Sequence, residues 1–451
     1  MSDKRQKNQL VLAFMEESRS EAPRVSTAGT ESLAAKRGTE SLAIGEQLME
    51  EICERENCQQ ALARVKANQG SAGVDGMTVH ELPEFLKQQW PAIREPLLSG
   101  TYRSEPVKRV EIPKPEGGVR KLGIPTVLDR FIQQAVMPVL PGKWDPTFSD
   151  HSYGFWPGRS AHQAVAAAPQ HIAAGYRWVV DLDLEKFFDR VNYDRLMAKM
   201  AERVSDKRLL KLIRTFLQAG VMEGGLVNPV DEGTPQGGPW SPWWSNIVLD
   251  EFDRELERRG LRFARYADDS NIYVRSRRAG ERVMESLTRF IMRKLKLQVN
   301  QQKSAVARPW ARKFLGFSFT SAGIPKRRIA PKAVDRFKER VRELTGRNTA
   351  RMAEELSRYL RGWIGYFGKC ETPSVLAGLE QWLRRKQWKR GTVRFAELRR
   401  RDVRADLAAQ TGGQPSWFPW RLANSPALSI AWPNAYFASL GIPRLTVKPV
   451  A

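Results

Sequence analysis

Apolar residues recur along this chain with two different periods, one typical of helices and one typical of strands. Residues 192–219, 281–297 and 331–405 repeat apolar positions every three to four residues, which predicts helices. Residues 107–113 and 119–124 are strand-like and flank a turn rich in Pro and Gly, so they predict a β-hairpin. The pattern therefore predicts mixed helices and strands, followed by a C-terminal third that is mostly helical.

A further strand-like segment, residues 178–184, carries acidic residues within an apolar run. Its sequence is Trp-Val-Val-Asp-Leu-Asp-Leu, and successive side chains of a strand point to opposite faces. Asp181 and Asp183 therefore share one face, while Val180, Leu182 and Leu184 share the other. Packing alone does not explain two acids in such a strand, and their spacing does not distinguish between them.

A second acidic pair lies in residues 261–274, which predict another hairpin. One apolar arm runs to Ala267, the turn is expected at Asp268-Asp269, and the second arm ends at Val274. Adjacent carboxylates repel each other, although Asp is also common in ordinary turns. Mg²⁺ would remove the repulsion, since it prefers carboxylate oxygens together with substrate phosphates. Two such ions about 4 Å apart activate a 3′-hydroxyl and stabilise a leaving pyrophosphate, which is the chemistry of nucleotidyl transfer.

The Gly- and Pro-rich residues 232–239 form a third candidate element. Paired glycines after Gln236 let a backbone approach a flat ligand closely. Gln236 is therefore a candidate contact to a nucleotide or to a template strand. An ordinary turn is the alternative, because Gly and Pro are the commonest turn residues.

The charge balance points to polyanionic partners. The 451 residues, a length typical of about three domains, hold 74 Lys and Arg against 50 Asp and Glu, a net charge of +24. Residues 321–451 carry 26 of the basic and 10 of the acidic residues, so 26 − 10 = +16 lies there. Residues 382–390 interleave basic residues with Trp, which suits phosphate neutralisation and base stacking, although a solvated helix face has the same composition.

Other classes of protein are disfavoured by what the chain lacks. No apolar run approaches the roughly 18 residues of a membrane span, and residues 10–15 are too short a run for a signal-peptide core. Three cysteines without a CxxC spacing fit a reducing cytosol, so we expect a cytoplasmic protein with no membrane partner. No histidine follows His171, which excludes a Cys/His zinc site or a His-Asn-His nuclease module in the later part of the chain.

Taken together and in this order, the segments resemble the reverse transcriptase–maturase family encoded by group II introns. The resemblance runs from about residue 48 to 445 and is closest to the bacterial class that lacks an endonuclease domain. It rests on five motifs in the same order and spacing: Phe187-Phe188-Asp189 after Asp183, Thr234-Pro235-Gln236-Gly237-Gly238, Tyr266-Ala267-Asp268-Asp269, Phe314-Leu315-Gly316-Phe317-Ser318-Phe319 and Gly362-Trp363-Ile364-Gly365-Tyr366-Phe367.

The resemblance assigns roles that the residues alone leave open. It implies that Asp183, Asp268 and Asp269 are the catalytic metal ligands and that the Leu184 carbonyl assists them. The implied cofactor is a pair of Mg²⁺ ions, with Mn²⁺ as a substitute. The segment 314–319 is implied to be the primer grip. Further residues are implied to contact nucleotide or template, with solvated charges and core aromatics as the alternatives: Lys114 and Arg120 at the triphosphate, Phe188 under the sugar, Gln236 and Gly237 in the glycine loop, and Lys303 as proton donor to pyrophosphate.

The same resemblance implies an α+β fold of the right-hand polymerase type. The expected domains are a flexible tail at 1–45, an N-terminal extension at 46–80, fingers and palm at 81–325, a helical thumb or maturase domain at 326–400 and a small basic DNA-binding segment at 401–451.

The implied activity is RNA-directed DNA polymerisation by two-metal nucleotidyl transfer, together with binding of group II intron RNA to assist splicing and retrohoming. The implied partners are that intron RNA, an RNA template–DNA primer duplex, dNTPs and target DNA, with the protein as monomer or homodimer. Two alternatives share much of the sequence evidence. One is an intron-independent reverse transcriptase in DNA repair or phage defence, and the other is an RNA-binding splicing cofactor without polymerase activity.

The chain departs from the family pattern at several tryptophans. Trp240, Trp243 and Trp244 replace small aliphatic residues after the glycine loop, and Trp156 stands where the family usually has Arg. Added volume in a packed helix typically costs about 1–3 kcal/mol per site. We therefore expect these positions to affect stability, and Trp156 to remove a nucleic-acid or ion-pair contact.

Overall fold

The computed structural model describes most of the chain between positions 47 and 446. The sequence predictions for residues 1–45, for Lys114 and Gln236, and for nearly all of 401–451 lie outside the described residues. The described residues are 47–113, 118–140, 144, 148–223, 226–228, 233, 237–345, 352–390, 438 and 441–446.

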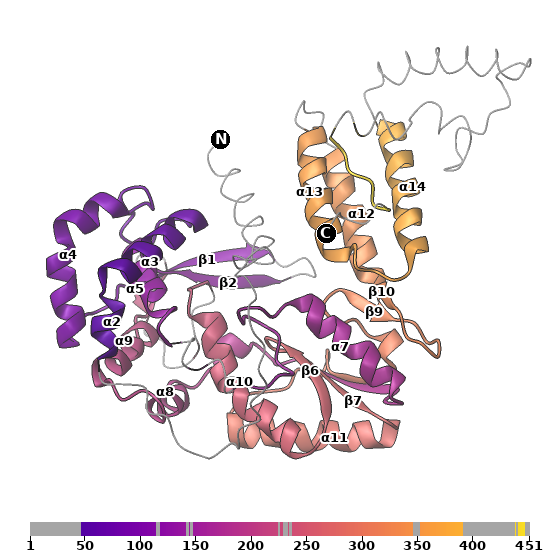
Figure 1. The fold of residues 1–451 in the computed structure, drawn as a ribbon, viewed down its shortest axis with the longest axis horizontal. Coiled ribbons are helices and arrows are strands. Elements are labelled where there is room, and N and C mark those ends of the chain that lie inside the picture. Colours follow the sequence, from indigo (N-terminus) through magenta and orange to yellow (C-terminus); the bar gives the residue numbers. More distant parts are fainter. Residues whose placement is uncertain are drawn as a thin grey trace, which may run out of the picture. The chain divides into compact units, whose positions relative to one another are not determined.

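The chain divides into two compact units, which are considered one at a time. The first comprises Met1–Ala164 and Val179–Val306, and the second comprises Val165–Trp178 and Ala307–Ala451. Helices and sheets alternate along the first unit, while long helices dominate the second (Figure 1). The predicted α+β character is therefore confirmed.

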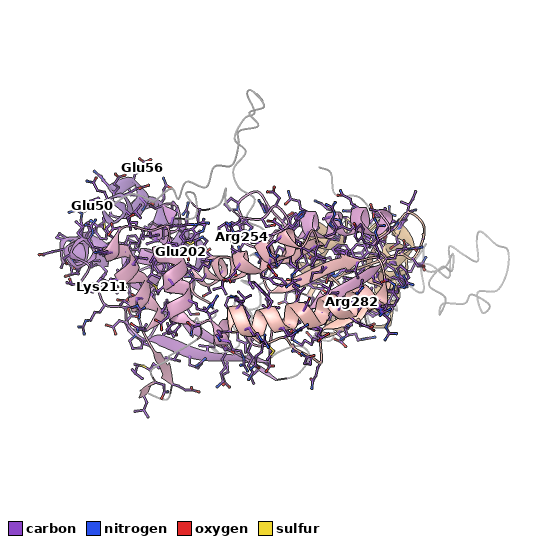
Figure 2. All side chains as sticks on the ribbon, turned by 90° about the horizontal axis from the view of Figure 1, so that it is seen from below. Glu50, Glu56, Glu202, Lys211, Arg254 and Arg282 are labelled. Carbon is purple, nitrogen blue, oxygen red and sulfur yellow. The ribbon has the colours of Figure 1, made fainter. Side chains whose placement is uncertain are left out.

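The N-terminal part of the first unit is helical. Helix α2 (Leu48–Ile52) is tied to α9 (Lys207–Leu217) because the Arg208 guanidinium donates to both carboxylate oxygens of Glu50 at 2.7 Å and to Asp206 at 2.9 Å. Figure 2 labels Glu50 and Lys211 at this end of the unit. Three further helices belong to this part: α3 (Arg55–Asn68), α4 (Leu82–Ser99) and α5 (Val127–Val136). Helix α3 packs on α5, and α4 packs on α9.

The first sheet contains the hairpin that the sequence predicts. Strands β1 (Val107–Pro113) and β2 (Val119–Ile124) are antiparallel, with Lys108 opposite Ile124. The sheet has the order β2-β1-β4-β5, in which β4 runs parallel to β1. Its remaining strands are β4 (Val221–Glu223) and β5 (Leu226–Asn228).

The second sheet of the first unit has the order β6-β7-β3-β8 and carries both acidic segments. Helix α11 (Arg277–Phe290) packs on this sheet at Gly280, where a Cβ atom would lie 2.5 Å from a methyl carbon of Val306. Glycine is therefore required there for close helix–sheet contact. The other elements are β3 (Trp178–Leu182), β6 (Arg262–Tyr266), β7 (Asp269–Val274), β8 (Ala305–Ala307), α8 (Tyr193–Ala201) and α10 (Ser241–Arg258).

The second unit is built around a helical core, which confirms the helical periodicity of 331–405 for the described residues 331–345 and 352–390. The rings of Phe337 and Trp363 lie 4.5 Å apart at its centre, and Ile442 and Leu445 are buried in the same cluster. The long helices are α12 (Pro331–Thr345), α13 (Met352–Phe367) and α14 (Pro373–Arg390), and the smaller elements are α7 (Ala161–Ala173), η5 (Pro309–Ala311), β9 (Phe317–Phe319) and β10 (Arg327–Ile329).

Two predicted helices differ from their expected extents. The stretch 192–219 forms two helices, because Asp206 ends the loop after α8 and accepts a hydrogen bond from the Arg208 N–H as an N-cap. The stretch 281–297 is α11 followed by a π-helical turn, η4 (Ile291–Leu295). Among the described residues, none of the helices has both the length and the apolar character that crossing a bilayer requires.

A buried carboxyl in the first unit gives a pH-dependent prediction. Asp129 is 1% exposed and accepts hydrogen bonds from Tyr102, Thr126 and the Glu105 N–H. Burial raises the pKa of Asp129 to about 6, although those hydrogen bonds act in the opposite direction. The native protein therefore binds more protons than the unfolded chain between about pH 4 and pH 6, and this contribution to stability is lost as the pH rises through 6.

We compare the free energy of unfolding of wild type with that of Asp129→Asn. We expect the wild-type value minus the variant value to be about 1 kcal/mol more positive at pH 5 than at pH 7. The amide does not titrate, so the variant lacks this contribution at both pH values. Urea denaturation of both proteins at each pH measures the difference. A difference that is equal at pH 5 and pH 7 contradicts a raised pKa at Asp129.

Candidate active site

The acidic strand β3 leads directly into Asp183. Val180 and Leu182 are buried and Asp181 and Asp183 are half-buried, so the predicted alternation is confirmed. The Asp183 N–H donates to the Ser304 hydroxyl at 3.0 Å, and its carbonyl accepts from the Asn300 N–H at 2.9 Å. These bonds fix the backbone of Asp183, and its side chain remains 27% exposed.

The second acidic pair lies where β6 turns into β7. Asp268 is in the turn and half-buried, whereas Asp269 is exposed and begins β7 opposite Tyr266. The turn therefore lies at Ala267-Asp268, and the expected position at Asp268-Asp269 is wrong by one residue. Ala267 adopts a φ of +54°, which is uncommon for a residue other than glycine. The Gly154 backbone lies against Ala267, and a Cβ atom on Gly154 would collide with the Ala267 backbone nitrogen.

Asp183 and Asp268 come from segments 268 − 183 = 85 residues apart and interact electrostatically. Burial is the largest cause that raises the pKa of Asp268, and the charge of Asp183 raises it further. The nearby cations of Arg120 and Arg265 lower it. Arg120 on β2, which the sequence assigned to the triphosphate, is therefore within electrostatic range of the acidic turn.

Lys303 reaches the same place from the loop before β8. Its Nζ lies 4.0 Å from Asp183 Oδ1, and its side chain is 62% exposed. An ammonium group at this position reduces the repulsion between the two carboxylates. It also places an exchangeable proton beside the candidate site, as the predicted role of Lys303 requires.

The Leu184 carbonyl does not take part in the backbone pairing between residues 183–185 and 298–300. Leu184 forms an isolated antiparallel bridge with Val299. That bridge is made by the flanking residues, since the Glu185 N–H donates to Gln298 and the Asp183 carbonyl accepts from Asn300. The arrangement is compatible with the predicted Leu184 carbonyl ligand.

Phe188 lies on a 3₁₀ turn, η3 (Phe187–Arg190), directly after Asp183. Phe187 is buried and Phe188 is half-buried, with their rings 5.1 Å apart and edge to face. Gly233 packs on this turn, because a Cβ there would lie 2.8 Å from the Asp189 carbonyl oxygen. Gly237 adopts a φ of +120° beside Gly123 of β2, so the described part of the glycine loop contacts the β1–β2 hairpin.

A buried arginine that the sequence reasoning missed supports the acidic turn. Arg265 is 0% exposed and donates to the Ala267 carbonyl at 2.9 Å, to Asn246 at 3.1 Å and to the Ser152 hydroxyl at 2.7 Å. It also forms a two-pronged ion pair with Asp253 of α10, whose side chain is 0% exposed. The sequence offered one sign of this role: Arg265 lies two residues after Phe263 and so shares its face of the strand.

The donor set fits a hard divalent cation. The side chains of Asp183, Asp268 and Asp269 carry carboxylate oxygens, which are the ligands that Mg²⁺ prefers. Among the described residues, no three Asp, Glu, His or Cys side chains are already grouped closely enough to hold a metal ion. Asp183 and Asp268 lie within electrostatic range of each other, and Asp269 adds a third carboxylate at the position after Asp268.

In the second unit, two of the sequence motifs contact each other. Leu315 and Gly316 form a tight turn with φ values of +50° and +80°, closed by hydrogen bonds between Phe314 and Phe317. The Tyr366 hydroxyl donates to the Leu315 carbonyl at 2.8 Å. The predicted primer-grip segment is thus held by the Gly-Trp-Ile-Gly-Tyr-Phe motif of α13.

The unusual tryptophans are accommodated in the core of the first unit. Trp240 is 1% exposed and meets Phe216 and Trp244 edge to face, at ring distances of 5.1 and 5.4 Å. Trp243 packs similarly on Trp144 at 5.6 Å. Such aromatic contacts are favourable beyond their buried area, so the added volume is absorbed by neighbouring rings.

Trp156 is also a core residue. It is 7% exposed, its ring lies 4.3 Å from that of Phe148, and its Nε1–H donates to the Ser152 hydroxyl at 3.3 Å. Ser152 in turn binds Arg265. Trp156 is therefore a packing residue next to the buried network, whereas an arginine contact to nucleic acid would need exposure.

We expect Trp240→Leu to lower the free energy of unfolding by about 3 kcal/mol, because it leaves a cavity and removes the hydrogen bond that Trp240 Nε1–H donates to the Gln133 carbonyl at 2.7 Å. Trp243→Leu is the matched control, since its buried Nε1–H has no acceptor among the described residues. Urea denaturation should find the control less destabilised by about 1 kcal/mol. Equal losses contradict the role of the Gln133 hydrogen bond.

Comparison with known proteins finds two family matches along the chain. Residues 112–319 match the family model described as reverse transcriptase (RNA-dependent DNA polymerase), and residues 334–406 match the group II intron, maturase-specific domain. Protein YkfC of Escherichia coli K12 is 33% identical over 272 residues, which cover 52% of this chain and 71% of YkfC.

The group II intron-encoded protein LtrA of Lactococcus lactis subsp. cremoris is 34% identical over 206 residues, covering 46% of this chain and 34% of LtrA. The match therefore spans about a third of LtrA. A chain of a partial Cas6-RT-Cas1–Cas2 complex is similar at 25% identity and a TM-score of 0.36, over 55% of this chain and 43% of that chain, a superposition too weak to carry an argument.

The match over residues 112–319 places the chain in the class of RNA-directed DNA polymerases. Within that class, the chain belongs to the family of reverse transcriptases and maturases encoded by group II introns.

Proposed function

We propose that this chain extends a DNA primer on an RNA template at a site formed by Asp183, Asp268 and Asp269. The observation that supports the proposal is that Asp183 and Asp268 lie within electrostatic range of each other, a repulsion that helps neither folding nor packing. Lys303 and Arg120 act on the same carboxylates, and a triphosphate needs cations of this kind.

The proposed cofactor is a pair of Mg²⁺ ions, replaceable by Mn²⁺ and held by the three carboxylates and the Leu184 carbonyl. When bound, these ions activate the primer 3′-hydroxyl and stabilise the leaving pyrophosphate. The side chains do the remaining work. Lys303 holds a proton beside Asp183, and Phe188 packs under the sugar of the incoming nucleotide. Lys114 and Arg120 bind the triphosphate, and Gln236 and Gly237 contact nucleotide or template.

We propose the domain division expected from the sequence. Residues 46–80 are the N-terminal extension, 81–325 the fingers and palm, 326–400 the thumb or maturase domain, and 401–451 a DNA-binding segment. The helical core around Phe337 supports a separate thumb. The tail at 1–45 is given no role. Free thiols at all three cysteines support a cytoplasmic location.

The proposed partners are an RNA template–DNA primer duplex, dNTPs, group II intron RNA and target DNA. The match of residues 334–406 to the maturase-specific domain supports binding of intron RNA to assist splicing and retrohoming. The net +16 on residues 321–451 supports polyanion binding in the same part of the chain. The protein acts as a monomer or a homodimer.

Primer extension tests the polymerase proposal. The purified full chain is given a DNA primer on an RNA template, dNTPs and Mg²⁺, and product lengths are read on a gel. We expect full-length DNA that depends on the template, the metal and all four dNTPs. Absence of extension under Mg²⁺ and under Mn²⁺ overturns the proposal and favours a splicing cofactor without polymerase activity.

In-vitro splicing tests the maturase proposal separately. The RNA that flanks the coding region is incubated at low Mg²⁺ with and without protein, and ligated exons are measured. We expect the protein to increase splicing of that RNA. Extension without any effect on splicing would favour an intron-independent reverse transcriptase.

A further inference from the structure

A group of stacked tryptophan and arginine side chains lies in the second unit, outside the catalytic residues. The Arg308 guanidinium carbon is 4.3 Å from the ring centroid of Trp178 and 5.4 Å from that of Trp310. The Arg177 guanidinium carbon is 5.8 Å from the Trp310 ring. Arg308 also donates a hydrogen bond to the Arg177 carbonyl at 3.1 Å. Arg177, Trp178, Arg308 and Trp310 are called the Arg–Trp platform below.

The platform is open to solvent rather than part of a core. Arg177 is exposed, and Trp178, Arg308 and Trp310 are each half-buried. The Arg177 side chain donates to the Ser321 carbonyl at 3.2 Å, which holds one edge of the platform to the loop before β10. The rings and guanidinium planes are therefore fixed in place before any ligand binds, which reduces the ordering cost of binding.

The surrounding sequence has a charge of one sign. Residues 165–178 and 307–334 contain no Asp or Glu, while they contain one and seven Lys or Arg respectively, a total of eight. The platform supplies two of these cations, and Arg312 and Lys313 lie two and three residues after Trp310. A ligand of the platform must therefore be anionic, and the two half-buried indoles require flat groups that stack on them.

We propose that the Arg–Trp platform binds a single-stranded nucleic acid. Bases stack on the open parts of the Trp178 and Trp310 rings, and Arg177 and Arg308 contact the backbone phosphates. Base stacking on aromatic side chains contributes about 1–3 kcal/mol per base, and the contribution tolerates any sequence. The platform is distinct from the polymerase proposal, because none of its residues is assigned to nucleotide, metal or primer.

Photocrosslinking of the full chain provides the primary test. A 12-nucleotide RNA and a DNA of the same sequence, each with 4-thio-substituted pyrimidines, are irradiated with the protein, and crosslinked peptides are identified by mass spectrometry. We expect crosslinks in the peptides that contain Trp178 and Trp310. They should persist in Asp268→Asn, whose polymerase site is disabled, and under excess primer–template duplex. Crosslinks confined to other peptides overturn the proposal. The RNA and DNA arms show which strand the platform prefers.

Binding of a labelled oligonucleotide, measured by fluorescence anisotropy, tests the stacking. Trp310→Leu should weaken binding of the base-containing strand by about 10-fold and leave an abasic strand of equal length unaffected. The matched control is Trp90→Leu, another half-buried Trp, in the first unit, and it should bind as wild type. Equal weakening of the base-containing and abasic strands overturns a stacking platform.

The charge contribution is tested with Arg308→Gln. Loss of one phosphate contact should lower the slope of log affinity against log salt by about 1. Arg282→Gln is the control, because Arg282 is an exposed arginine on α11 (Figure 2). Vesicles with anionic headgroups separate a membrane surface from a nucleic-acid surface. The proposal would be overturned if wild type floats with such vesicles and Arg308→Gln does not.

Discussion

We expect the replacement of Asp183 with asparagine to reduce RNA-templated primer extension by at least about 10²-fold while the protein stays folded. Asparagine has nearly the same size as aspartate but no negative charge, and the charge is what binds a divalent cation. Metal ions supply several kcal/mol of transition-state stabilisation in such reactions, and 1.36 kcal/mol corresponds to a factor of ten in rate. The Asp183 backbone bonds to Ser304 and Asn300 do not involve the carboxylate, so the variant retains them.

Asp181→Asn is the matched control for that prediction. Asp181 lies on the same face of β3, two residues earlier, and its charge acts on the hydroxyl of buried Tyr273. Burial is the main cause of the raised pKa of Tyr273, and Asp181 adds to it. We expect Asp181→Asn to extend primers at close to the wild-type rate. Equal loss in both variants, or no loss in Asp183→Asn, contradicts the assignment of Asp183 as the catalytic carboxylate.

Replacing Arg265 with methionine should lower the free energy of unfolding by about 3–5 kcal/mol, because it leaves the Asp253 carboxylate buried without its ion-pair partner. Extension should fall as well, since the Ala267 carbonyl beside Asp268 loses its donor. Urea denaturation and extension assays at a temperature where both proteins are folded measure the two effects separately.

The double variant Arg265→Met with Asp253→Leu separates stability from positioning. Replacing both members of a buried ion pair by apolar residues is often neutral or stabilising, so much of the lost stability should return. Extension should stay low, because no side chain then donates to the Ala267 carbonyl. Recovery of wild-type extension in the double variant would show that Arg265 acts only through stability and would contradict its positioning role.

The sequence singled out the acidic residues because their chemistry is unusual in strands. Asp183 and Asp268 have no packing reason to stand in apolar segments, and alternation correctly predicted half-buried Asp181 in β3 and half-buried Asp183 directly after it. The turn position was wrong because the left-handed residue is Ala267, which carries no turn signal, whereas Asp-Asp does. The electrostatic approach of Asp183 to Asp268 depends on sheet pairing and could not be read from spacing.

Arg265 was missed for a different reason. Within an arm of apolar residues, one arginine reads as a solvent-facing exception, and only its buried partners Asp253, Asn246 and Ser152 make it a core residue. Those partners lie 12, 19 and 113 residues away along the chain. The tryptophans behave similarly. Volume counted at Trp240 alone predicted overpacking, whereas the structure supplies Phe216 and Trp244 around it.

Helix existence was easier to predict than helix limits. The periodicity of 192–219 is real in both α8 and α9, but the Asp206 N-cap between them interrupts it. Charge patterning located binding capacity only broadly. It marked the C-terminal third as basic, yet Arg177 and Trp178 of the Arg–Trp platform come from a segment more than 100 residues earlier and join Arg308 and Trp310 only through folding.

The rate of a single nucleotide addition to a DNA primer on an RNA template, measured at increasing Mg²⁺ concentration, tests the proposed polymerase site most directly. Wild type and Asp268→Asn are compared under single-turnover conditions with protein in excess. We expect wild type to add the nucleotide only with the divalent cation, at a rate that saturates with its concentration, and Asp268→Asn to be slower by at least about 10²-fold. A wild-type protein that adds no nucleotide, or an Asp268→Asn variant that adds it at the wild-type rate, would contradict the proposed site.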